Sequence, residues 1–182
     1  MDPVTFSDAA AFDTWLEANH AVPEGVWIRM AKAGSGIPSL TSDEAVDVGL
    51  CWGWISGQRK GLDSEYYLQK YVPRRPRSHW SQVNVDKVAE LTAAGRMRAP
   101  GLAEVAAAKA DGRWAAAYPS QSSFTVPPDL AEALDRRPAA RAAFEELDRT
   151  RRYAIVLELL RARSGKTRAT RLAKALANLE PR

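Results

Sequence analysis

The sequence has one cysteine, two histidines and no apolar run long enough to cross a membrane. Cys51 cannot form an internal disulfide, and a chain of this size needs none, so we expect a reducing compartment, the cytoplasm. The N-terminus lacks the basic and apolar regions of a signal peptide. Neither His20 nor His79 stands at a metal-ligand spacing from Cys, Asp or Glu, so we expect no metal and no cofactor.

Phosphate-binding and nucleophile motifs are scarce as well. Residues 34–36 read GSG without the lysine and hydroxyl of a P-loop, and residues 53–61 do not match GxGxxG. Cys51 lies between Leu50 and Trp52 on a helix that we expect to be buried, where a cysteine acts as a small hydrophobe. The sequence therefore favours a binding module over an enzyme.

The composition is that of a globular protein, with 46% hydrophobic and 26% charged residues and six tryptophans to bury. Its length predicts one domain over residues 1–182. Within it, we expect residues 1–80 to form a part with a helix, a strand and a β-hairpin, and residues 81–182 to be mainly helical. The predicted fold class is α+β.

The predicted elements follow from hydrophobic periodicity and from capping residues. A strand is expected over residues 25–32, and a hairpin pairs residues 54–60 with residues 66–72, giving a small antiparallel sheet of about three strands. Helices are expected at residues 7–19 with Ser7 as N-cap, 42–52 with a Thr41/Glu44 capping box, from Ser81 or Asn84 to 94, 100–110, 129–135, 138–147, 149–163 and 166–179. Ile155, Leu159 and Leu160 are expected to face inward.

Basic residues gather in two segments. Residues 149–182 hold ten Lys or Arg against two Glu, and residues 66–85 hold Lys70, Arg74, Arg75 and Arg77 without an acid. Such asymmetry indicates an anionic partner: phosphate, nucleic acid or an acidic protein. An ordinary solvated helical hairpin would give the same pattern in the C-terminal segment.

The segment 73–84, PRRPRSHWSQVN, is the best candidate for a ligand site. Its arginines offer fork-shaped donors, its prolines restrict the backbone, and a following helix N-terminus adds positive potential. The candidate anion ligands are Arg74, Arg75, Arg77, Ser78, His79, Trp80, Ser81 and Asn84, with Lys70, Trp54, Ser56 and Arg59 as a secondary set. The alternative is structural: Trp80 in the core, the serines as caps and the arginines paired with acids.

Two other functions stay open. One is an enzyme that acts on a small phosphorylated or carboxylated substrate through Cys51, His79 or Asp63. The other is an adaptor for an acidic protein, which requires an exposed apolar patch around Trp80 or Tyr67 beside the arginines.

Several spaced motifs resemble the YdeI/OmpD-associated (OmdA-like) bacteriocin-protection family. They are SLTSDEAVDVGLCWGWISGQRKGLD, YVPRRPRSHWSQVN, GRMRAPGL, AKADGRW, PPDLAEAL and KTRATRLAKAL, in this order along nearly the whole chain. The resemblance implies a bacteriocin-protection or stress-resistance role and carries over no catalytic residue. Where the family commonly has GWIDG, this chain has GWISG, so Ser56 stands at the usual acidic position. A catalytic carboxylate at this position would be absent.

Overall fold

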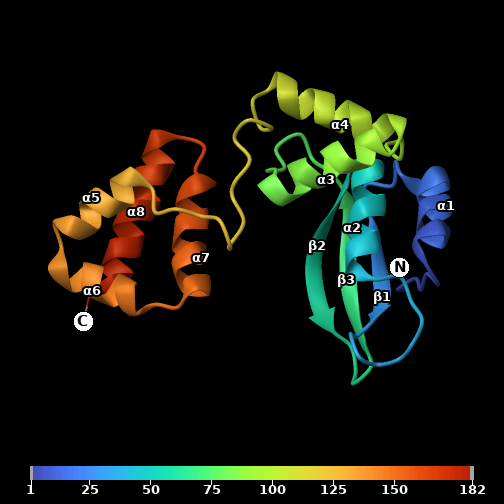
Figure 1. Ribbon diagram of the computed structural model, residues 1–182, viewed down its shortest axis with the longest axis horizontal. Helices are drawn as coiled ribbons and strands as arrows, with labels where there is room; N and C mark the ends of the chain where they lie inside the picture. Colours follow the sequence, from blue (N-terminus) through green and yellow to red (C-terminus); the bar gives the residue numbers. More distant parts are fainter. Residues whose placement is uncertain (1, 181–182) are drawn as a thin grey trace. The chain divides into compact units, whose positions relative to one another are not determined.

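The computed structural model describes residues 2–180, which divide into two compact units (Figure 1). The first unit contains the chain up to Trp80 and Asn84–Ala116, and the second contains Ser81–Val83 and the chain from Ala117 onward. Arg182, the last residue of the basic C-terminal segment, lies outside the described residues. The organisation of the whole chain as one domain stays a prediction.

The first unit is built on a three-stranded antiparallel sheet (Figure 1). The strands β1 (Val26–Ala31), β2 (Trp54–Gly61) and β3 (Tyr66–Pro73) lie in the order β1-β3-β2. The α+β class and the predicted hairpin are confirmed. Val4 also forms an isolated parallel β-bridge with Ile28, on the edge of β1 that faces away from β3.

Helices α1 (Ala9–Asn19) and α2 (Ser42–Cys51) help to cover one face of this sheet. Val26, Ile28 and Met30 of β1 are buried, whereas Trp27 and Arg29 between them keep exposure, because successive side chains point to opposite faces. Tyr71 of β3 joins the buried set and meets the ring of Phe12 edge-on, 5.6 Å between centroids. The alternation predicted for residues 25–32 is confirmed.

Capping side chains set the starts of the two helices. The capping box at α2 is confirmed: the Thr41 hydroxyl accepts the amide of Glu44, whose carboxylate accepts the amide of Thr41. The prediction of Ser7 as the first N-cap is wrong by one residue. The Asp8 carboxylate accepts the Ala11 amide at 2.9 Å, and Ser7 donates its hydroxyl to Asp8. An ionised carboxylate is the stronger acceptor at a helix N-terminus.

Two further helices complete the first unit. Helix α3 (Gln82–Ala93) begins in the short Ser81–Val83 segment and ends before Gly95, and α4 (Ala99–Ala110) follows. Helix α4 packs closely on α2 through Gly101, where an added Cβ would lie 2.1 Å from the Cys51 carbonyl oxygen. This glycine is therefore required by contact distance, since no side chain fits there.

The second unit is a group of four helices (Figure 1). They are α5 (Pro128–Asp135), α6 (Pro138–Glu146), α7 (Arg149–Leu160) and α8 (Gly165–Leu179). Leu130, Val156 and Leu159 are fully buried in their core. The inward orientation of Leu160 is wrong: its side chain is exposed, and Val156, one helical turn earlier, is buried instead.

Arginines of the second unit connect its segments through ion pairs and hydrogen bonds. Arg168 of α8 forms a two-pronged ion pair with Asp129 of α5, at 2.7 and 2.8 Å, and donates to the Leu159 carbonyl of α7. Arg149 donates to the carbonyls of Gln121 and Ser122. Much of the basic charge in residues 149–180 therefore satisfies oxygens within this unit.

We expect Gly101→Ala to lower the free energy of unfolding by about 1–3 kcal/mol or more, because the new methyl group would overlap the backbone of Cys51. Urea denaturation followed by circular dichroism measures the change. Gly165→Ala is the matched control, since nothing lies within 4 Å of its added Cβ and the substitution is in a helix. Equal stability of the two variants would contradict the tight contact between α2 and α4.

The Asp129–Arg168 pair predicts a dependence of stability on pH. The hydrogen bond from Arg168 lowers the pKa of Asp129, so the pair stabilises the fold above the unfolded pKa of about 4 and this stabilisation is lost as pH falls through the lower folded pKa. Both side chains are about one third exposed, so we expect less than about 1 kcal/mol. Urea unfolding at pH 7 and pH 2.5 should give a larger difference between wild type and Asp129→Asn at pH 7. If wild type and Asp129→Asn differed by the same free energy of unfolding at both pH values, the Asp129–Arg168 pair would not be the source of the pH dependence.

Candidate functional site

The predicted ligand segment forms a corner immediately after β3, which we call the arginine corner (residues 74–80). Arg74 begins it and is 5% exposed, with its backbone amide donating to the Gly53 carbonyl. The Arg74 guanidinium lies 3.6 Å from the ring centroid of Trp80 and donates to the His79 carbonyl at 3.1 Å. Arg74 thus joins the two ends of the corner from the inside.

Trp80 is also interior, with 1% of its surface exposed. Its indole packs on Trp114, which follows α4, at 4.8 Å between ring centroids. Arg74 covers the Trp80 ring as a cation over an aromatic face, an interaction that strengthens as it is desolvated. Arg74 and Trp80 therefore belong to the packing of the corner, as the structural interpretation of Trp80 expects.

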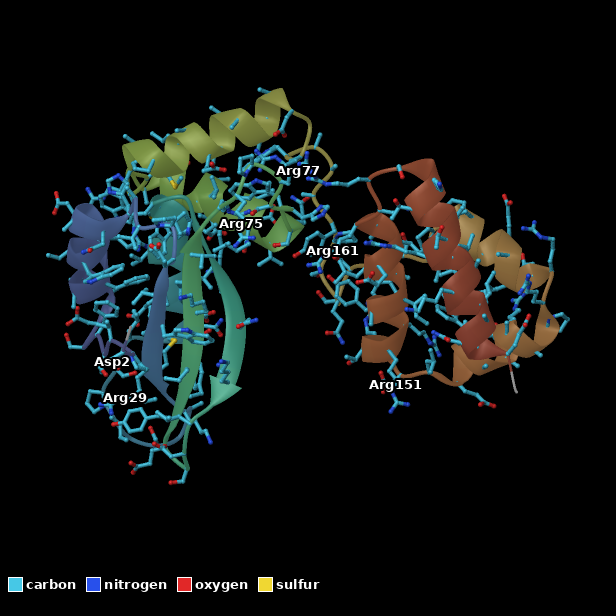
Figure 2. All side chains as sticks on the ribbon, turned by 180° about the vertical axis from the view of Figure 1, so that it is seen from behind. Asp2, Arg29, Arg75, Arg77, Arg151 and Arg161 are labelled. Atoms are coloured by element: carbon cyan, nitrogen blue, oxygen red, sulfur yellow. The ribbon has the colours of Figure 1, made fainter. Side chains whose placement is uncertain are left out.

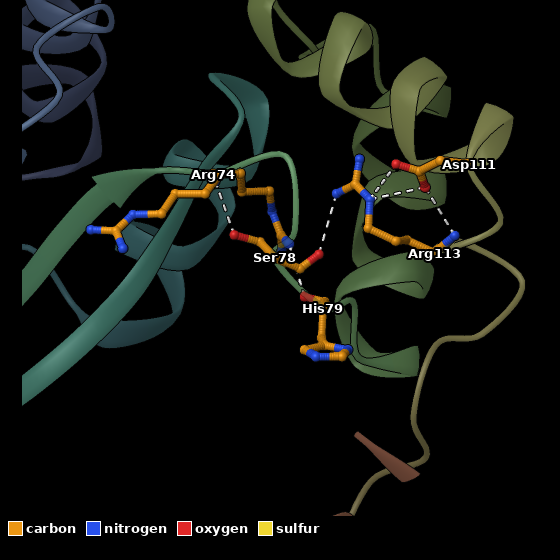
Figure 3. Close-up of polar contacts among 6 residues, drawn as sticks. Arg74, Ser78, His79, Asp111 and Arg113 are labelled. Carbon is orange, nitrogen blue, oxygen red and sulfur yellow. Dashed lines mark hydrogen bonds and ion pairs between the residues drawn. The ribbon is translucent and has the colours of Figure 1, made fainter. Parts of the chain in front are cut away.

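The rest of the arginine corner contains a tight turn at residues 75–78 (Figure 3). The Ser78 hydroxyl accepts the Arg75 amide at 2.9 Å, and the Ser78 amide donates to the Arg75 carbonyl at 2.8 Å. Arg113 donates to the Ser78 carbonyl at 3.2 Å, and Asp111 holds that guanidinium at 2.7 Å. The turn is closed from within and tied to the end of α4.

Arg75 and Arg77 of this turn are exposed (Figure 2). His79 is half-buried. Of the three predicted arginines, two therefore present guanidinium groups at the surface and the third supports them. Ser78 uses its hydroxyl within the turn. Asp111 and Arg113 are missed by the sequence interpretation, although they stand in the quoted AKADGRW motif.

The other predicted ligands lie apart from this turn. Ser81 belongs to the second unit, where it bridges to Tyr118. Trp54, Ser56 and Asn84 line one cavity of about 30 Å³ beside Tyr71, which has room for about one water molecule. The Tyr71 hydroxyl is buried without a protein hydrogen-bond partner in the described chain, and burial raises its pKa.

Ser56 lies in β2 opposite Tyr71, at the last position before a β-bulge. The buried Gln69 amide donates to the carbonyls of Gly57 and Gln58, both at 3.1 Å, and so satisfies groups that the bulge leaves outside the ladder. The position that is commonly acidic in the resembled family is thus a strand position beside a small polar cavity.

Lys70 and Arg59, also in the secondary set, lie over aromatic rings of the sheet. The Lys70 ammonium is 5.5 Å from the centroid of Trp27, and the Arg59 guanidinium is 3.8 Å from the centroid of Tyr67. Sequence reasoning missed Trp27, although its place in the alternating run 26–31 already put it opposite the core face.

Two of the three residues considered for catalysis, Cys51 and Asp63, are held in structural roles. Cys51 is buried at the end of α2, and burial raises the pKa of its thiol, which disfavours a thiolate. The Asp63 carboxylate accepts the amides of Glu65 and Tyr66 in the hairpin turn. His20 stacks on Trp52 at 5.2 Å, as expected for a histidine at a helix end.

A cavity of about 310 Å³ beside Cys51 is lined by Asp13, Arg96 and Arg98. Asp13 uses both oxygens, one for the Trp52 indole at 2.7 Å and one for Arg98 at 2.6 Å. Within residues 2–180, no group of three His, Cys, Asp or Glu is placed to hold a metal ion. No helix in that part of the chain is long and apolar enough to cross a membrane.

Comparison with protein families divides the chain in two. Residues 4–104 match a domain of unknown function, DUF8412, and residues 123–181 match the family of bacteriocin-protection, YdeI or OmpD-associated proteins (OmdA). A comparison with curated proteins and one with solved structures found no match. The resemblance to the OmdA family is confirmed for residues 123–181, in the C-terminal helical region, whereas the quoted motifs up to residue 104 lie in the part that matches DUF8412. The chain therefore belongs to the DUF8412 family, and its residues 123–181 are similar to the bacteriocin-protection, YdeI or OmpD-associated family.

Proposed function

We propose that this bacteriocin-protection-type protein is a binding module, and that its arginine corner holds an anionic ligand in the cytoplasm. The observation that carries the proposal is that Arg75 and Arg77 are exposed residues on a turn closed by its own hydrogen bonds. A protective or stress-resistance role then follows from capture of an anionic partner rather than from catalysis.

Rigidity of the turn supports this proposal. Binding costs less when the ligating groups are already ordered, and the turn is ordered by Ser78, Arg113 and the buried Arg74. Guanidinium groups also suit phosphate and carboxylate oxygens because their donors form a planar fork. The two exposed arginines supply the charge, and the interior of the corner supplies the preorganisation.

The buried Arg74 is expected to act on stability. Replacing it with Met removes the cation over Trp80 and leaves the His79 carbonyl without its donor, which we expect to cost about 1–3 kcal/mol. Urea denaturation monitored by tryptophan fluorescence measures this loss. Arg75→Met is the control, and its exposed position predicts a change within about 0.5 kcal/mol. An Arg74→Met variant with the free energy of unfolding of the wild type would refute the supporting role of the buried guanidinium.

The exposed pair is tested with linear polyphosphate, an anion that has neither sugar nor base. We expect wild type to bind it at low salt and the double variant Arg75→Gln/Arg77→Gln to bind more weakly. If both arginines contact phosphates, counterion release predicts a fall of about 1.4–1.8 in the slope of log K against log[salt], at about 0.7–0.9 for each contact. Titration calorimetry over a range of KCl concentrations measures both quantities.

Arg136→Gln/Arg151→Gln is the matched control, since it removes the same charge from exposed helix positions in the second unit. It should keep most of the affinity and the salt slope. The proposal fails if wild type does not bind polyphosphate at 20 mM KCl, or if the corner variant and the control lose the same affinity.

A further inference from the structure

The face of the sheet opposite the covered face has its own chemistry. By the strand register it carries Trp27 and Arg29 from β1, Lys60 from β2, and Tyr66, Leu68 and Lys70 from β3. We call it the open face. Each of these side chains is half-buried or exposed, so none is sealed into a core.

All charged residues of the three strands are basic. The three strands contain Arg29, Arg59, Lys60 and Lys70 and not one Asp or Glu. The nearest acids along the chain lie outside the strands: Glu24 precedes β1, and Asp63 and Glu65 are in the hairpin turn, where the Asp63 carboxylate accepts two backbone amides. The cations of the open face are therefore not neutralised by carboxylates of their own strands.

These cations lie over aromatic rings instead. The ammonium groups of Lys60 and Lys70 are 4.7 and 5.5 Å from the centroid of Trp27, and the Arg29 guanidinium is 4.7 Å from the centroid of Tyr66. Such contacts are weak at exposed sites, so a ligand that offers a phosphate can draw a lysine off the ring at small cost. The ring then becomes free to stack.

Trp27 is held firmly at this position. Its carbonyl accepts the Val4 amide at 2.8 Å, and the next amide on that edge, from Arg29, donates to Val4 at 2.8 Å. On the other side, β3 pairs Trp27 with Lys70. An aromatic ring on a strand bonded along both edges is a fixed platform, in contrast to a ring on a loop.

We infer that the open face binds single-stranded nucleic acid, with a base stacked on Trp27, a second base on Tyr66, and phosphates on Lys60, Lys70 and Arg29. Trp27 pairs with Lys70, which lies four residues from Tyr66 along β3, a spacing of about 13 Å. Rings and cations therefore alternate over a distance of a few nucleotides. Aromatic platforms between basic side chains are the means by which single strands are held without sequence preference.

The chemistry favours this ligand over a duplex or an acidic protein. A duplex keeps its bases stacked within the helix, so the Trp27 ring would contribute nothing to its binding. An acidic peptide would engage the lysines and again leave the Trp27 ring without a stacking partner. Because this site is separate from the arginine corner (Figure 2), the inference goes beyond the proposed function.

The test compares a fluorescein-labelled twelve-residue oligothymidylate with an abasic phosphodiester strand of equal length, by fluorescence anisotropy at several KCl concentrations. Wild type should prefer the strand that carries bases by at least about fivefold, the lower bound for one stacked base. Trp27→Ala should lower this preference, Trp27→Ala/Tyr66→Ala should bind both strands equally, and Trp27→Phe should retain most of the preference.

The lysines are tested separately from the ring. Lys60→Gln/Lys70→Gln should lower the salt slope by about 1.4, from about 0.7 for each phosphate contact with a single strand. Lys32→Gln/Lys109→Gln is the matched control: it removes the same charge from the first unit, and Lys109 also lies over a tryptophan, 5.3 Å from the centroid of Trp114. The control variant should show the same salt slope of binding as the wild type.

Equal binding of the two strands by wild type would overturn the inference, as would a preference that Trp27→Ala leaves unchanged. Tighter binding of a duplex, or of polyglutamate of equal charge, would overturn it in favour of another partner. Circular dichroism confirms the fold of each variant before titration. Arg75→Gln/Arg77→Gln should keep the preference for bases, so a failure of the arginine corner and a failure of the open face give different results.

Discussion

The sheet of the first unit buries one of its two faces, and much of the molecule follows from this constraint. On the covered face, Tyr71 packs on Phe12 and Gly49. Trp54 is anchored beside it by its indole donor on the His20 carbonyl at 2.9 Å. With the large rings on that side, the alternation of strand side chains sends Trp27, Lys60 and Lys70 to the other. Their exposure is a consequence of the pleat and needs no special loop.

The same sheet positions the arginine corner. The strand β3 ends at Pro73, and the Arg74 amide bonds back to the Gly53 carbonyl at the start of β2, so the direction in which the chain leaves is fixed. A long cationic side chain would normally remain in water, but Arg74 gains a ring face and a carbonyl at the point where it turns inward. Its burial orders the turn that carries Arg75 and Arg77.

Patterns that act over short distances were predictable from the sequence. The Thr41/Glu44 capping box, the hairpin around residues 61–65 and the alternation along residues 26–31 each express a local rule, and each is present. The inward face of α7 was predicted less well because Val156 and Leu160 lie one turn apart on the same side of the helix, so the spacing of apolar residues does not distinguish them. Which of them is buried depends on where α5 and α8 pack, and this is tertiary information.

The candidate site was harder to predict from the sequence because it also depends on tertiary contacts. The segment 73–84 contains three arginines that the sequence does not distinguish. Tertiary contacts separate them: Arg74 is buried over Trp80, which packs on the distant Trp114, while Arg75 is exposed. The grouping of Lys60 and Lys70 over Trp27 likewise needs the register of β2 on β3 and of β3 on β1. A bulge between Ser56 and Arg59 shifts that register, so counting along the hairpin cannot supply it. A basic side chain on such a sheet acquires its role from the strand beside it, and the distinction between a supporting arginine and a ligand-binding one is made by packing.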